Sequence, residues 1–268
     1  MLFRSVNQQI SNIADLNRQI IAAKATGGDT SDLEDHRDLA ISAIAEYMQI
    51  NTYTRNDGSV VVSTMQGRVM VDGVLPHAIT YTPQATVIAG TTFNPVLLHG
   101  IDLTQQFGSG RLAALVDQRD VSLPARTAEL NQLAMTLYSQ MTSATLATTD
   151  VAGTVAVNEA NHFFAGVDPA ALDNAASIQV HPDIVADTSL LYNLAAARDL
   201  ANAASAENIA FAVAGQLPAM TASLSVYGNA ILARLAGENA AVAMERQYHD
   251  NLKLAIEVKI GEIGRAHV

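Results

Sequence analysis

Hydrophobic residues recur every three or four positions at the start of the chain. The recurring positions are Phe3, Val6, Ile10, Ile13, Asn17 and Ile20. Such spacing aligns side chains in one seam along a helix and is typical of helices that pack on a partner helix. The polar member, Asn17, stands where a polar residue can fix the packing register. We therefore predict a first helix that needs a partner, inside the chain or beyond it.

A second helix is predicted after a glycine-containing break at 26–29. Ser31 and Glu34 have the spacing of a capping box, in which each satisfies a free backbone N–H of the first turn. The helix should run to about Met48, and the short connection predicts an antiparallel helical hairpin. Acidic residues surround Arg37 and His36 here, and they form either a solvated face or an ion-pair patch to a neighbouring subunit. These acidic residues are Asp32, Glu34, Asp35 and Asp38.

From Gln49 the pattern changes to short runs of strand-forming residues separated by turn signals. Asn56-Asp57-Gly58-Ser59 is typical of a tight hairpin turn. Several short strands with dense turn signals predict a small β domain inserted into a helical one. The expected strands are 52–54, 60–64, 68–71, 78–82, 86–88 and 95–98.

Helical spacing returns after Gly110, and Pro124 should mark a kink or the first turn of the next helix. That next helix carries a stripe of Leu130, Leu133, Leu137 and Met141. Residues 143–185 are expected to be mostly loop and short elements. A short helix is predicted at 195–203, and one or two further helical turns at 209–216.

The longest predicted helix covers 221–260. Its apolar positions, Leu224, Ile231, Leu235, Val242, Leu252 and Ile256, lie at multiples of roughly three and a half residues. Gly228 and Gly237 weaken it locally. A helix of this length spans about 60 Å, which suits rods and filaments. Residues 262–268 match the translation of a common sequencing-library adapter in one frame, so we expect a non-native tail without defined packing.

The predicted fold class is α+β. An elongated α-helical bundle, formed as a discontinuous rod domain by 1–49 and 109–261, carries the small β domain of 50–108 as an insertion. The apolar seams have two interpretations: an ordinary intramolecular core, or packing against neighbouring subunits. The subunit-packing candidates are Phe3, Val6, Ile10, Ile13, Asn17, Ile20, Leu235, Val242, Leu252 and Ile256.

Composition narrows the function classes. Hydrophobic residues make up 49% and charged residues 15%, which supports a folded core and not disorder. The net charge of −11 comes with scattered Lys and Arg, so we expect no nucleic-acid partner and no docking on anionic lipid. The absence of cysteine excludes disulfide and thiol chemistry. No run of about 18–20 apolar residues predicts membrane insertion, and no signal peptide is visible.

Motifs for catalysis or ligand binding are not found. The seven histidines lack metal-site spacing, so we expect surface or capping roles. The Gly108-x-Gly110 segment lacks a third glycine and the Walker lysine. Asp57-Gly58 lacks the remaining ligands of a calcium loop. We therefore predict no catalytic residue, no metal site and no cofactor, and a protein that is not an enzyme.

Two stretches together resemble the flagellar hook-associated protein FlgK family. The segment from Val6 to Asp38 is similar to the family's early helix followed by its Asp-Leu-x-Asp-x-Arg-Asp motif, here Asp32-Leu33-Glu34-Asp35-His36-Arg37-Asp38. The segment from Gly108 to Asp120, followed by Leu123-Pro124-Ala125-Arg126, resembles the helix that follows the family's β insertion. The inserted strands and the long late helix also match the family's layout.

The resemblance implies a structural subunit of the bacterial flagellum at the hook–filament junction, acting by subunit–subunit packing. Implied partners are copies of itself, neighbouring hook and filament junction proteins, and an export chaperone that binds through a missing terminus. The implied location is extracellular, in the flagellum, after export by the flagellar type III route. The family's terminal motifs, Asn-Asn-Ile-Ala-Asn and Gly-Val-Asn-Leu-Asp-Glu-Glu, are missing, so we expect an internal fragment that lacks both terminal regions.

Two other classes stay open. A surface-exposed adhesion or host-binding module of a flagellar axial protein predicts exposed aromatic or basic residues around Tyr53, Tyr81 and Phe93. A peptidoglycan-cleaving enzyme predicts converging carboxylates in a groove.

Overall fold

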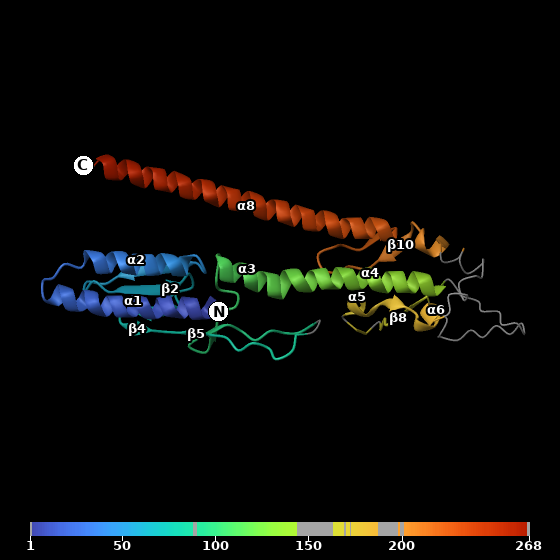
Figure 1. The fold of residues 1–268 in the computed structure, drawn as a ribbon, viewed down its shortest axis with the longest axis horizontal. Coiled ribbons are helices and arrows are strands. Elements are labelled where there is room, and N and C mark those ends of the chain that lie inside the picture. Colours follow the sequence, from blue (N-terminus) through green and yellow to red (C-terminus); the bar gives the residue numbers. More distant parts are fainter. Residues whose placement is uncertain are drawn as a thin grey trace, which may run out of the picture. The chain divides into compact units, whose positions relative to one another are not determined.

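The computed structural model describes residues 2–87, 90–143, 163–168, 170–171, 173–186, 198 and 201–266. The chain divides into two compact units, Met1–Pro124 and Ala125–Val268. Each unit combines α-helices with small antiparallel sheets (Figure 1). The fold class is therefore α+β, as predicted.

The first unit begins with the predicted helical hairpin, α1 (Leu2–Ala25) and α2 (Ser31–Ala45). The two helices lie side by side in Figure 1. The predicted capping box is wrong, because the residue that precedes α2 is Thr30 and its side chain makes no capping bond, while the Asp29 carboxylate accepts from the Ser31 N–H at 3.0 Å. Instead the carboxylate of Glu34 accepts a hydrogen bond from the Thr30 hydroxyl at 3.0 Å and pairs with the Lys24 ammonium at 3.1 Å.

A four-stranded antiparallel sheet follows, formed in order by β1 (Ile50–Thr54), β2 (Val60–Thr64), β3 (Val69–Asp72) and β4 (Leu75–Pro76). The predicted hairpin turn joins β1 to β2, with Thr54 opposite Val60. Alternate residues of β2 are buried, as the period-two geometry of a strand requires.

A second sheet contains three strands of two residues each: β5 (Ile79–Thr80), β6 (Leu97–Leu98) and β7 (Ile101–Asp102). Parts of the predicted strands at 78–82 and 95–98 are confirmed. The predicted strand at 86–88 is wrong for residues 86 and 87, which lie in irregular backbone, and residue 88 is outside the described residues. Strands β4 and β7 were not predicted, because two residues are too few to show an alternation.

Helices and strands of the first unit share one hydrophobic core. α1 contacts β3, β4 and β5, so the buried face of the strand region packs on the helical hairpin. The predicted division into a discontinuous helical domain, 1–49 with 109–261, and a β domain, 50–108, stays a prediction. The core includes Val6, Ile10, Ile44, Met48, Val62, Met70, Ile79, Leu103 and Phe107.

The helical segment that follows runs through three pieces. α3 (Arg111–Asp117) continues into a π-helical stretch, η1 (Gln118–Ser122), and then into α4 (Leu123–Ser143). Pro124 lies in the first turn of α4, one of its two predicted roles. The preceding turn is the π-helical stretch, so the interruption predicted at the proline falls where the helix departs from α-helical hydrogen bonding.

In the second unit the predicted helical turns at 209–216 are wrong. β10 (Ile209–Phe211) pairs with β11 (Met220–Ala222) in an antiparallel hairpin. The side chains of Ile209 and Phe211 are buried and Ala210 between them is exposed, which is the period of a strand.

Other parts of this unit are short, as expected for a loop-rich stretch. They are β8 (Phe164–Ala165), α5 (Asn174–Ser177), β9 (Gln179–Val180) and α6 (Pro182–Ala186). Residues 201–204 are helical, in agreement with the end of the helix predicted at 195–203. Most of the remainder of that predicted helix lies outside the described residues.

The longest helix is α8 (Leu224–Ala266), which has 43 residues and a length of about 65 Å. It begins later than predicted because Thr221 and Ala222 belong to β11. It continues to Ala266, so residues 262–266 of the expected tail are helical, and a non-native origin of 262–268 stays a prediction. Within the described ranges, no helix combines the length and the apolar character that a membrane span needs.

Candidate functional site

The α1 members of the predicted packing set lie inside the first unit. Val6, Ile10, Ile13 and Ile20 have at most 1% of their surface exposed, so the chain's own strands and helices cover them. Phe3 is half-buried, and its ring centre lies 5.7 Å from that of Tyr81. The structure thus places this seam in an intramolecular core, and a role in subunit packing stays a prediction.

Asn17 bonds to the strand region and also to helix α2, whose Arg37 donates to its Oδ1 at 3.3 Å. Its Nδ2 donates to the carbonyl oxygens of Val60 and Gly73 at 2.8 and 2.6 Å, and its Oδ1 accepts from the Val60 N–H at 3.0 Å. The side chain is fully buried. Asn17 therefore links α1 to the sheet and to α2, and its predicted role in fixing a packing register stays a prediction.

Asn7 makes the same kind of contact with β5, which belongs to the second sheet of the first unit. Its Nδ2 donates to the Ile79 carbonyl oxygen and its Oδ1 accepts from the Ile79 N–H, both at 2.8 Å. The amide thus imitates a neighbouring strand. The sequence does not predict this bond to a strand, because Asn7 lies on the polar side of the helix, where an asparagine is expected to face solvent.

The acidic turn of α2 does not surround an exposed cation. Arg37 is 5% exposed, and its guanidinium donates to the Gly58 carbonyl oxygen at 2.7 Å and to Asn17 Oδ1 at 3.3 Å. The acidic cluster therefore faces outward while its arginine faces the core. The ion-pair patch to a neighbouring subunit stays a prediction.

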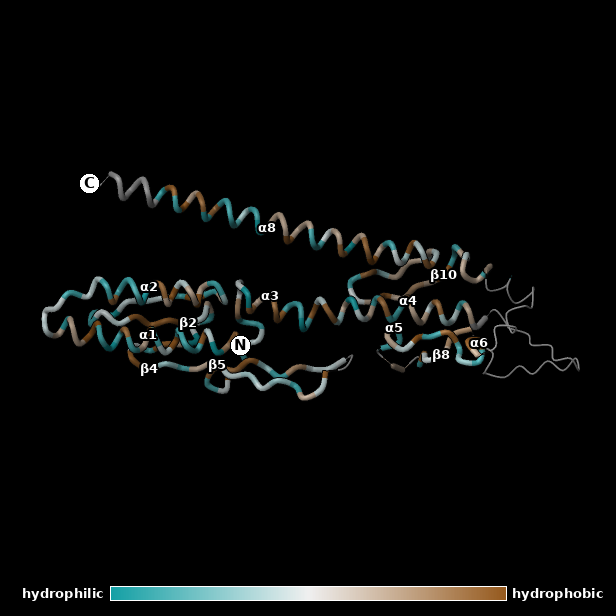
Figure 2. Tube along the Cα trace, viewed as in Figure 1, coloured by the Kyte–Doolittle hydropathy of each residue, from teal (hydrophilic) through white to brown (hydrophobic). Residues whose placement is uncertain are grey.

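The α8 members of the packing set are placed differently. Leu235 packs on the second core with Ile231 and Tyr227, which are buried. Beyond Leu235 the helix exposes a row of large apolar side chains at four-residue spacing, which we name the α8 stripe. Figure 2 shows apolar turns alternating with polar ones along this helix. The α8 stripe comprises Met244, Tyr248, Leu252 and Ile256, which expose 66, 64, 44 and 51% of their surfaces.

The opposite side of this part of α8 is charged. Arg246 and Asp250 form an exposed pair at 3.9 Å, and Lys253 and Glu257 form another at 4.0 Å. Exposed pairs of this kind add only a few tenths of a kcal/mol each. Large apolar side chains are exposed outside the α8 stripe as well, among them Leu254 and Val258, at 60 and 52%.

Ion pairs anchor the first turns of α8 within the second unit. The carboxylate of Glu129 on α4 is fully buried and accepts from the Arg234 guanidinium and from the Gln216 N–H, the latter at 3.0 Å. Arg234 also pairs with Glu238, which accepts from Arg126 of α4 at 2.9 Å. These paired charges fix α8 to α4 and to the β10–β11 connection.

A tyrosine lies beside this network. The ring of Tyr227 is fully buried and stacks on Phe211, with ring centres 4.1 Å apart. Burial, and then the nearby Glu129 carboxylate, raise the pKa of the Tyr227 hydroxyl. A phenol held neutral in this way acts here as a packing group.

Aromatic residues considered for a binding module are separated. Tyr53 on β1 is 66% exposed. Tyr81 and Phe93 instead contact Arg119, whose guanidinium carbon lies 5.8 and 4.9 Å from their ring centres. The Asp120 carboxylate also binds Arg119 and raises the pKa of its guanidinium. The structure therefore does not gather the three aromatic residues on one surface.

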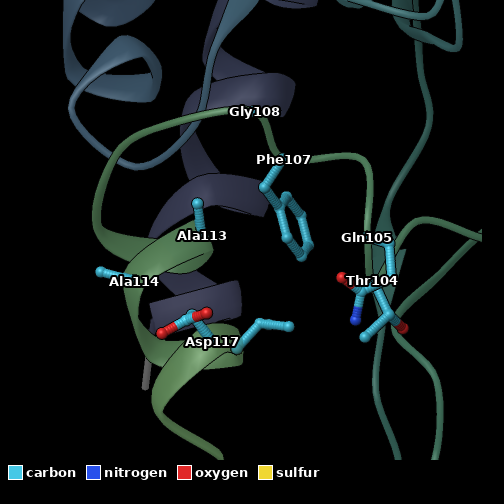
Figure 3. A pocket seen from close by; sticks show the side chains of 8 residues that line it. Thr104, Gln105, Phe107, Gly108, Ala113, Ala114 and Asp117 are labelled. Atoms are coloured by element: carbon cyan, nitrogen blue, oxygen red, sulfur yellow. The ribbon is translucent and has the colours of Figure 1, made fainter. Parts of the chain in front are cut away.

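The first unit also has an open cavity of about 390 Å³ between α3 and the segment that precedes it. Figure 3 shows the Phe107 ring facing Ala113 and Asp117 across this space. Asp117 is the one carboxylate among its lining residues. A pair of converging carboxylates, as a glycan-cleaving mechanism needs, is therefore not part of this cavity.

One family model matches more than half of the chain. The model of the flagellar hook-associated protein FlgK helical domain matches residues 2–163. Among solved structures, the flagellar hook junction protein FlgK from Burkholderia pseudomallei is similar, with a TM-score of 0.48 and 23% identity; the alignment covers 63% of this chain and 30% of that chain. The chain thus spans about a third of that relative. No curated protein matches the sequence.

The family match covers more than half of the 268 residues, and it includes α1, α2, α3 and all strands of the first unit. The resemblance found in the two sequence motifs is confirmed by it. Proteins of this family are structural components of the flagellum. The chain belongs to the flagellar hook-associated protein FlgK family.

Proposed function

We propose that the chain is a structural subunit at the junction between flagellar hook and filament, and that it works by packing the α8 stripe against a neighbouring helix. The observation that carries this proposal is the exposed stripe itself, on a helix of 43 residues in a member of the FlgK family. A helix that exposes large apolar side chains is stabilised when a second apolar surface covers them.

The energy available from such packing is substantial. Complete burial of a Leu, Ile or Met side chain contributes about 1.5–3 kcal/mol. Side chains of the α8 stripe already bury part of their surface, so each adds roughly half of that value. Four of them then contribute about 3–6 kcal/mol before the entropy of association is subtracted.

The proposed partners are copies of the same subunit and the neighbouring hook and filament junction proteins. Contacts between different surfaces of identical subunits are heterologous and build open arrays, which suits a tubular axial structure. The proposed location is extracellular, after export by the flagellar type III route, and an export chaperone is a further proposed partner. Family membership supports each of these proposals.

Deletion of the full-length gene tests the junction role. We expect cells that assemble hooks but carry no attached filaments, visible by electron microscopy and as loss of swimming. Normal filaments in the deletion strain would contradict the proposal.

A paired set of variants tests the surface. Tyr248→Asp with Leu252→Asp adds two charges to the α8 stripe, and Ala243→Asp with Gln247→Asp adds the same two charges on the other side of the helix. We expect the first pair to abolish complementation of the deletion strain and the second to restore swimming. Both proteins should keep the parent melting temperature by circular dichroism, since these positions are exposed. Full complementation by the stripe variant would overturn the packing role.

A further inference from the structure

Two histidines that are distant in the sequence lie against each other in the first unit. The ring centres of His77 and His99 are 4.0 Å apart, with an angle of 61° between the rings. The two residues are 22 positions apart, so motif spacing along the chain gives no sign of the pair. The pairing of β5 with β6, in which Ile79 lies opposite Leu98, brings them together.

The backbone fixes both residues. The N–H of His77 donates to the Met70 carbonyl oxygen at 2.8 Å. His99 and Gly100 form the two-residue turn between β6 and β7, with φ angles of 53° and 74°. Among the described residues, His99 alone has a positive φ without being glycine. Such a conformation is uncommon for a non-glycine residue and is often found at functional positions.

We propose that His77 and His99 together bind one divalent transition-metal ion of the class Cu²⁺, Ni²⁺ or Zn²⁺. Neutral imidazole is a preferred ligand for these ions. A nitrogen–metal distance of about 2.0 Å places the centres of two imidazoles in adjacent coordination positions about 4.5 Å apart. The observed separation of 4.0 Å is close to that value, so small side-chain rotations suffice to admit the ion.

In this proposal the protein supplies two ligands to the ion, His77 and His99, and water molecules supply the others. Within the described part of the chain, no group of three or more His, Cys, Asp or Glu side chains is placed to hold a metal. His99 is exposed and His77 half-buried, so an ion and its water ligands have access. The net charge of −11 favours the approach of cations. For a given site, Cu²⁺ should bind most tightly of the three ions.

Titration of the full chain with Cu²⁺ tests the proposal. By calorimetry at about pH 7.5 we expect one tight Cu²⁺ per chain. His77→Gln and His99→Asn should each weaken this binding by about tenfold or more. Asparagine is chosen at position 99 because it tolerates a positive φ.

His249→Gln is the matched control, since this histidine is exposed on α8 and lies 3.9 Å from Glu245. We expect its Cu²⁺ affinity to equal that of the parent. Electron paramagnetic resonance of the bound Cu²⁺ should show two nitrogen ligands in the parent and fewer in either single variant. Unchanged Cu²⁺ binding in the double variant His77→Gln/His99→Asn would overturn the proposal, as would the absence of a tight site in the parent.

Discussion

A side-chain amide offers a donor and an acceptor in the same geometry as a peptide group. Asn7 and Asn17 use this property to bond α1 directly to strand backbones. The peptide groups that they satisfy belong to the first residue of β2, the turn between β3 and β4, and the first residue of β5. The position of the helix on the sheet therefore depends on two side chains in addition to nonspecific apolar contact.

Replacement of Asn17 tests this dependence. Asn17→Ala removes the hydrogen-bond partner of the Val60 N–H and of the Val60 and Gly73 carbonyl oxygens. Each buried group left unsatisfied lowers the free energy of unfolding by about 1–3 kcal/mol. We expect a loss of roughly 3 kcal/mol or more in the free energy of unfolding by urea. The control Asn12→Ala removes only local bonds to Gln8 and Gln9 and should change it by about 0.5 kcal/mol or less. Equal losses in both variants would contradict the assigned role.

Glu238 gives a prediction for pH. Its hydrogen bond from Arg126, with the charges of Arg234 and Arg126, lowers the pKa of the Glu238 carboxyl below the ordinary value of 4.5. A lowered pKa means that the pairing stabilises the folded protein fully above about pH 4.5 and is lost as pH falls through the lowered value. Glu238→Gln should therefore reduce the melting temperature at pH 7, and the difference from the parent should shrink below pH 4.5.

The control for this titration is Glu257→Gln, on the exposed part of the same helix. Its pair with Lys253 has a separation of 4.0 Å, with both side chains mostly in solvent. The melting temperature of this variant should follow that of the parent throughout. A Glu238→Gln difference that is constant from pH 7 to pH 3 would argue against the assigned ion pair.

At the scale of elements, hydrophobic periodicity predicted the long helices correctly and missed several short strands. The seam of α1 and the apolar series of α8 extend over many turns, so the sequence alone located both helices. The sequence predicted helical turns at 209–216, where the structure has β10. Ile209 to Phe211 contains one apolar–small–apolar alternation, which is too short to distinguish a strand from a helix. Its strand identity comes from pairing with Met220–Ala222, a contact that a local pattern does not contain.

The packing surface was predicted in part for a similar reason. The predicted series has steps of 7, 4, 7, 10 and 4 residues, close to multiples of three and a half, and such a period drifts by about 20° per heptad around a straight helix. Leu252 and Ile256 fall in the α8 stripe, whereas Val242 is two residues from Met244, about 200° around the helix, and so lies on the opposite side. Met244 and Tyr248 were missed, although their four-residue spacing to Leu252 is visible in the sequence. No such signal exists for the contact between His77 and His99, which depends on strand pairing.

Gly215 in the β10–β11 connection gives a prediction at this scale. Its φ is 55°, and a Cβ there would overlap the Ala125 carbonyl oxygen and the Glu129 carboxylate. Gly215→Ala should therefore destabilise the second unit by several kcal/mol. Gly67→Ala is the control, since Gly67 also has a positive φ but no atom within 4 Å of its added Cβ. We expect about 1 kcal/mol for the control, from backbone strain alone, in thermal unfolding.

On the scale of the molecule, the two compact units contain separate cores. One core combines α1, α2 and the strands of the first unit, and the other lies under β10, β11 and the start of α8. Separate cores predict separate unfolding, because cooperativity follows shared packing.

Calorimetry of the full chain checks this expectation. We expect two transitions, of which Asn17→Ala lowers one and Gly215→Ala lowers the other. A single transition that both variants shift together would show that the units unfold as one body.

The two asparagines of α1 have a mechanical consequence. They are ten residues apart, about 15 Å along the helix, and both are bonded to strand backbones. Sliding α1 along the sheet by one turn, about 5.4 Å, would rupture both attachments at once. The first unit should therefore resist shear along the helix axis. A force applied to α1 would be transmitted to the strands through both asparagines before the helix could slide.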